Sequence, residues 1–229
     1  VTDEVVAVSV ADYQTLATLG ATFAEGVVPS ISDTVENILA AAADLVDADG
    51  VAIAPIAATD VAFVVTAAQG VLLDSLGVDF GLETTATVED TAAGILAAEA
   101  ELAAVIADPE SIPIAVSVTG AEVTLTVAEL GALNALNATF VAAPNVVDTL
   151  AISEVEGALV ADAVAIAGAN DVSLTVTSPT AGADSIALDI TAAGAGTLTF
   201  DFTQDANDTV VLSATSSVTG FATLAVVAG

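Results

Sequence analysis

Apolar residues recur with helical spacing along the first 170 positions, in blocks that resemble one another. Each block opens with a strand-like run similar to Val-Ser-Val or Leu-Thr-Val, and the three blocks are 8–23, 65–80 and 125–140. Each then continues as a short helical stretch and ends in Leu-Gly or Leu-Asn, with Phe three residues later. These segments begin 57 and 60 residues apart, which predicts a repeated structural unit.

Helix start and stop signals support this unit. Gly20, Gly77 and Asn137 follow the first helical stretch, and Gly and Asn tolerate the left-handed backbone that closes a helix. A second helix is expected to follow in each copy, with one apolar face that Glu99 interrupts in the second copy and Asp162 in the third. The predicted N-caps of these second helices are Asp33, Asp90 and Ser153.

The pattern changes near Asp171 to an alternation of apolar and polar residues, broken by clusters of Gly, Pro, Asn and Asp. We therefore predict an α+β fold: three αβ repeats (strand–helix–helix–strand) over 1–60, 61–120 and 121–170, followed by a small antiparallel β-sheet or sandwich over 171–229. The last strand, Phe221 to Val227, carries no charge, and such an edge is open to pairing with a neighbouring subunit.

The chain's ionisable groups are almost all acidic, which restricts the chemistry it can perform. Its 229 residues include 31 Asp and Glu but no Lys, Arg, His or Cys. Catalysis by a Ser-His pair, a thiolate, a Schiff-base amine or an imidazole base lacks its residues, so only carboxylate chemistry remains, and nucleic acid would be repelled by the net charge of −31. No carboxylate pair stands out as catalytic, so we expect a protein that is not an enzyme and requires no cofactor.

Hydrophobic residues make up 55% of the chain, and the mean hydropathy is +0.89. The longest uncharged stretches, 209–229 and 130–147, are interrupted by Ser, Thr, Asn, Gly or Pro, so we expect no membrane insertion. The chain begins at Val1, which a removed signal peptide or a domain cut from a longer protein would explain. We expect secretion.

The sequence motifs that the blocks share resemble repeats in very large secreted bacterial surface proteins of the adhesin-like type. The resemblance rests on the Val-Ser-Val-Ala-Asp opening at 8–12, the Leu-Gly-Ala-Thr-Phe turn at 19–23 and the Ser-Asp-Thr-Val-Glu-Asn-Ile helix start at 32–38. It covers about 170 residues and implies an exported structural or adhesive role, of the kind found in appendages or surface layers. It implies no catalytic residues.

Two acidic turns are candidate calcium sites. Asp47 and Asp49 have the spacing of the start of a calcium loop without its distal Glu, and a solvated turn explains them as well. Asp205, Asn207 and Asp208 offer three oxygen ligands in a predicted turn, where turn chemistry alone also favours Asp and Asn.

Together these features predict an extracellular or cell-surface structural subunit that self-assembles into a filament, tube or surface layer. Its partner would be a second copy of itself, through close apolar packing and β-strand pairing, with divalent cations as a further option at the interfaces. The alternative is an adhesin-like binding module for a carbohydrate or a surface, with calcium dependence left open.

Overall fold

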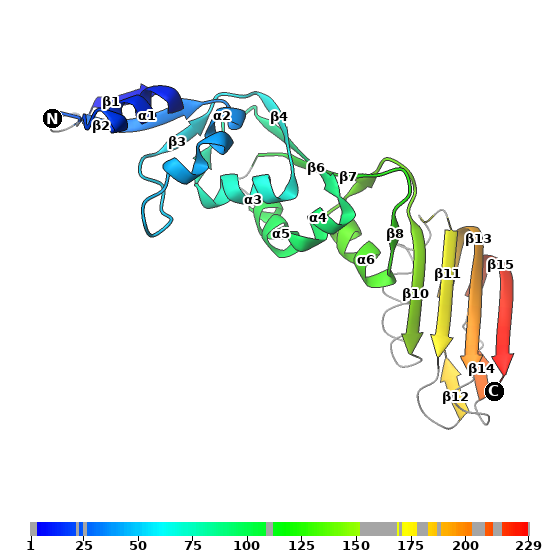
Figure 1. Cartoon of the computed structure of the whole chain (residues 1–229). Coiled ribbons are helices and arrows are strands. Elements are labelled where there is room, and N and C mark those ends of the chain that lie inside the picture. Colours follow the sequence, from blue (N-terminus) through cyan, green and yellow to red (C-terminus); the bar gives the residue numbers. More distant parts are fainter. Residues whose placement is uncertain are drawn as a thin grey trace. The chain divides into compact units, whose positions relative to one another are not determined.

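The computed structural model describes residues 4–21, 23–24, 27–108, 112–151, 169, 171–177, 183–186, 189–202, 209–212 and 217–228. The chain divides into two compact units, Val1–Ser117 and Val118–Gly229. Figure 1 labels the elements of both.

Strands of the first unit belong to two sheets, and the helices lie between them in the chain. The first sheet has the order β1-β2-β3-β5. Its strands are β1 (Glu4–Val8), β2 (Val27–Asp33), β3 (Ile56–Ala58) and β5 (Val78–Asp79). The second sheet begins with β4 (Ala62–Val65), β6 (Thr85–Thr91) and β7 (Ile114–Thr119). The helices are α1 (Val10–Thr18), α2 (Val35–Ala40), a 3-10 turn (Ala42–Asp44), α3 (Ala67–Ser75), α4 (Ala92–Ala97) and α5 (Glu99–Ala107).

The described part of the second unit consists of helix α6 and the strands of a larger sheet, one of which precedes the helix. The elements are β8 (Thr124–Leu125), α6 (Val127–Ala135), β9 (Thr139–Phe140), β10 (Asn145–Ala151), β11 (Asp171–Thr177), β12 (Ala183–Ile186), β13 (Asp189–Phe202), β14 (Thr209–Leu212) and β15 (Ser217–Ala228). A five-stranded sheet has the order β8-β10-β11-β13-β15, while β12 pairs with β14 (Figure 1). The end of β7 lies beyond the division at Ser117, and in the second unit the Val141 N–H, next to β9, donates to the Val118 carbonyl of β7.

The predicted antiparallel C-terminal sheet is wrong, because every strand pair whose register the structure gives is parallel. Asn145 lies beside Asp171, Ser173 beside Thr197, and Thr197 beside Thr223, so these partners are 26, 24 and 26 positions apart in sequence. Alternating residues identify a strand but not its direction. The long connections that parallel pairing needs are present, and part of their length is used by β12 and β14.

The fold class is therefore α/β, and the prediction of three strand–helix–helix–strand repeats is also wrong. Strand β2 separates α1 from α2, and β6 separates α3 from α4, so the helices that we expected to be consecutive are not. The second helix of the expected third copy falls outside the described residues. The four predicted segments, 1–60, 61–120, 121–170 and 171–229, stay a prediction; the division of the structure falls after Ser117.

Apart from α5, whose N-cap is Ala98, the described α-helices begin at hydroxyl side chains rather than at the predicted carboxylates. The N-caps of α2 and α4 are Thr34 and Thr91, each one residue after the predicted Asp33 and Asp90. Ser9, Thr66 and Thr126 cap α1, α3 and α6. Full capping boxes join Thr66 to Gln69 and Thr126 to Glu129. The predicted cap Ser153 is not among the described residues.

The predicted helix-closing positions are confirmed. Gly20, Gly77 and Asn137 have φ values of +64°, +61° and +53°, in the left-handed region. Asn137 is the only non-glycine residue with a positive φ in the described part of the chain. Its short polar side chain tolerates a conformation that costs most residues energy.

Buried aliphatic side chains line the strands and the inner helix faces of each unit. The largest fully buried ones are Ile31, Ile38, Leu45, Ile56, Leu73, Ile95, Leu102, Leu130, Leu133 and Leu174. Phe23, Phe80 and Phe140, which we expected to anchor the core, are only half-buried. Among the side chains that the structure describes, aliphatic ones therefore provide most of the core, and these three rings lie nearer the surface.

Candidate functional site

Carboxylates connect neighbouring segments by accepting hydrogen bonds from helix N-termini. Each bond joins an aspartate to the first backbone N–H of a helix 21 to 25 residues earlier in the chain. The four pairs are Asp33 with Val10, Asp60 with Val35, Asp90 with Ala67, and Asp148 with Val127, at N···O distances of 2.6–3.1 Å. Anions are stabilised at helix N-termini, so these acids gain a partner in a chain without basic side chains.

Asp33 accepts three hydrogen bonds. Its Oδ1 accepts from the Asn37 side-chain amide and from the Thr34 N–H, both at 2.8 Å, while its Oδ2 accepts from Val10. The Asn37 hydrogen bond is the main cause that lowers the pKa of Asp33, partial burial acts in the opposite direction, and the two backbone donors lower it further. Asp33 therefore stays ionised to a lower pH in the folded protein than in the unfolded chain.

The acidic turn at Asp47 is held by its own backbone. Asp47 Oδ1 accepts from the N–H groups of Asp49 and Val51, at 2.9 and 3.0 Å, and the Asp47 N–H donates to the Val51 carbonyl at 2.8 Å. Gly50 adopts a φ of +79° in this turn. These bonds account for the conformation of the turn and engage one of the two Asp47 carboxylate oxygens, so the solvated turn and the calcium site both stay open.

The other calcium candidates, Asp205, Asn207 and Asp208, lie outside the described residues. Within the described part of the chain, no group of three or more acidic side chains is arranged to hold a metal ion. The calcium sites therefore stay predictions.

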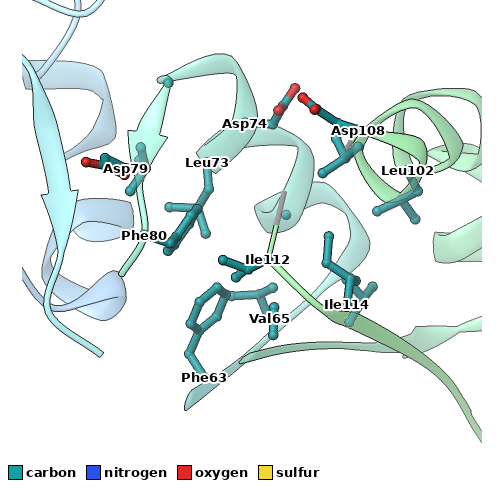
Figure 2. A pocket seen from close by; sticks show the side chains of 16 residues that line it. Phe63, Val65, Leu73, Asp74, Asp79, Phe80, Leu102, Asp108, Ile112 and Ile114 are labelled. Atoms are coloured by element: carbon teal, nitrogen blue, oxygen red, sulfur yellow. The ribbon is translucent and has the colours of Figure 1, made fainter. Parts of the chain in front are cut away.

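A cavity of about 210 Å³ lies within the first unit, among β4, α3, β5, β6, α5 and the segment that leads into β7. Its walls are mainly apolar and include Phe63, Val65, Leu73, Val78, Val88, Leu102, Ile112 and Ile114. Figure 2 shows these side chains converging from strands on one side and helices on the other. The Phe63 and Phe80 rings stack with their centroids 5.2 Å apart and their planes at 22°.

Three carboxylates line the same cavity. Asp74 comes from α3, Asp79 from β5, and Asp108 from the end of α5, and all three are exposed to solvent. In Figure 2 the carboxylates of Asp74 and Asp108 point toward one another above the apolar side chains. The site thus combines an apolar interior with an anionic rim.

Two of the sheets each end in an outer strand, one in each unit. β1 is the first strand in the order of its sheet, and β15 is the last strand of the five-stranded sheet. Val5 and Val6 of β1 are 64% and 36% exposed, although consecutive strand residues face opposite sides. Neither face of β1 is covered at these positions.

Comparisons with known proteins identify no relative. No family model matches the chain, and no curated protein and no solved structure matches it either. Among the described residues, no helix combines the length and apolar character that crossing a membrane requires.

Sequence reasoning missed the cavity and the carboxylates that cap distant helices. Phe63 and Asp108 have no sequence motif that links them, because the cavity forms only when β4, α3 and α5 meet. The aspartate caps did leave a signal, since Asp33, Asp90 and Asp148 each precede a Thr. We assigned two of these aspartates to the wrong helix.

Proposed function

We propose that this protein is a non-enzymatic structural subunit that assembles with copies of itself through the open edges of its parallel sheets. The observation that carries the proposal is β1: an outer strand with exposed valines on both faces. Parallel sheets are normally covered on both faces, so a strand like β1 is suited to a partner that supplies another strand and its covering side chains.

Strand β15 provides a complementary edge. Its twelve residues, Ser217–Ala228, include no charged side chain, and the chain has no Lys with which to protect a sheet edge. Both β1 and β15 run parallel to their neighbours, so β1 of one molecule continues the sheet of another if it adds beside β15 in the same direction. This contact joins two different surfaces and therefore repeats from molecule to molecule, giving a ring or an open polymer.

The net charge of −31 opposes this association. Salt shortens the range of the repulsion to about 8 Å at physiological ionic strength, and divalent cations that bridge carboxylates reduce it further. We therefore infer that assembly strengthens with ionic strength. A chain without Lys or Arg also offers no trypsin site, which supports a role outside the cell.

Sedimentation velocity and negative-stain microscopy over a series of NaCl concentrations, with calcium and with chelator, test the proposal. Wild-type protein should form rings, filaments or sheets that grow with salt. The double variant Val5→Lys/Val6→Lys should stay monomeric, because it places two charges on the proposed contact. Val51→Lys is the control, since Val51 is 61% exposed in a turn away from β1.

Deleting Phe221 to Gly229 tests the other edge and should also prevent assembly. Circular dichroism of each variant establishes that loss of assembly is not loss of fold. Wild-type protein that stays monodisperse at every salt concentration would refute self-assembly and favour the binding-module alternative. Assembly that tolerates both changes would refute the edge contact.

A further inference from the structure

We propose that the cavity of the first unit binds a small organic cation, consisting of one ring or short alkyl chain that carries an ammonium group. The proposal does not depend on self-assembly. It rests on the apolar interior of the cavity and on the three exposed carboxylates at its rim.

The cavity has room for such a ligand. An apolar cavity of about 150 Å³ in another protein stays dry and binds benzene, and the volume here is about 210 Å³. Gly70 contributes to the free space on α3. A Cβ at Gly70 would lie 3.7 Å from Val88 Cγ2 and 3.9 Å from Leu102 Cδ2, which is ordinary contact. A glycine at this position therefore leaves open a space that an alanine methyl group could occupy.

The rim selects for positive charge. The carboxylates of Asp74 and Asp108 point toward one another (Figure 2), and their negative charges make the electrostatic potential at the mouth favourable for a cation. A ligand's ammonium group at the mouth would donate hydrogen bonds to both carboxylates, while the apolar part of the ligand fills the interior. A hard dication fits less well, because calcium takes six to eight oxygen ligands and the cavity walls are mainly hydrocarbon.

Isothermal titration with three probes of similar shape tests the proposal on the intact chain: benzylamine, which is cationic at pH 7, neutral benzyl alcohol, and anionic benzoate. We expect benzylamine to bind most tightly, benzyl alcohol several-fold more weakly, and benzoate least. Raising the salt concentration should weaken benzylamine and leave benzyl alcohol unchanged. Equal affinity for benzylamine and benzyl alcohol would overturn the proposed charge selection.

Variants locate the site. Asp74→Asn and Asp108→Asn should each lower benzylamine affinity about two- to five-fold, the range expected for one exposed charge pair, without changing benzyl alcohol. Glu101→Gln is the matched control, because it removes one exposed carboxylate from α5 outside the cavity.

Gly70→Ala and Gly70→Leu place progressively more side chain in the cavity and should weaken both ligands in that order. Circular dichroism separates filling of the cavity from loss of fold, and the Asn variants test the rim without altering the interior. Benzylamine binding that none of these changes affects would overturn the assignment.

Discussion

Replacing Gly94 by Ala should destabilise the protein, although Ala favours helices. Gly94 lies in α4, where Ala is better than Gly by up to about 1 kcal/mol. A Cβ at Gly94, however, would come within 2.6 Å of Asp90 Oδ1, which is closer than such atoms approach in proteins. The Asp90 carboxylate must then move from its position.

Hydrogen bonds set the size of the effect. Asp90 Oδ2 accepts from the Ala67 N–H at 3.1 Å, and Oδ1 accepts from the Thr91 N–H at 2.7 Å. Moving the carboxylate leaves a helix N-terminal N–H without its acceptor, at a cost of about 1–3 kcal/mol. After the helix preference is subtracted, Gly94→Ala should lower the free energy of unfolding by about 1 kcal/mol.

A double-mutant cycle tests the cause. Asp90→Ala alone should cost about 2 kcal/mol, and in that background Gly94→Ala should become neutral or stabilising, because the obstruction is gone. Urea denaturation measures both, with a shifted midpoint at constant m-value. Glu89→Ala, which removes a neighbouring exposed carboxylate, should change stability by less than about 0.5 kcal/mol. An equal effect of Gly94→Ala in both backgrounds would contradict the reasoning.

Two further predictions concern stability. In contrast to Gly94→Ala, Gly70→Ala should raise the free energy of unfolding by up to about 1 kcal/mol, because the added methyl group has room. A lower urea midpoint would show that the cavity does not accept the methyl group. The pKa of Asp33 is lower in the folded than in the unfolded protein, so its stabilisation is complete above its ordinary pKa of 3.8 and is lost as the pH falls through the folded value. The difference in unfolding free energy between wild type and Asp33→Ala should therefore be constant at neutral pH and shrink below pH 3.8; a difference that persists in acid would exclude the ionised carboxylate as its source.

Local signals in the sequence were more informative than long-range ones. Gly20, Gly77 and Asn137 could be predicted as helix ends because their backbone conformation depends mainly on the residue itself. Asp33 and Thr34 can both cap a helix, so their roles could be separated only by the position of α1.

Neither the strand direction nor the cavity could be predicted from the sequence, for a related reason. Alternation along β11 and β13 is the same whichever way the strands pair. Phe63 and Phe80, or Asp74 and Asp108, become neighbours only after β4, α3 and α5 have packed. The residue types do not indicate that these side chains become neighbours, because Phe is common in cores and Asp is common throughout this chain.

The parallel register has a mechanical consequence. Each strand of the five-stranded sheet is paired with residues about 25 positions away, as Ser173 is with Thr197 and Thr197 with Thr223. Under tension, the loss of one outer strand releases only the length of chain up to the next one, about 80–90 Å when fully extended. The remaining sheet keeps its pairing, so the protein can lengthen in steps and absorb work at each of them.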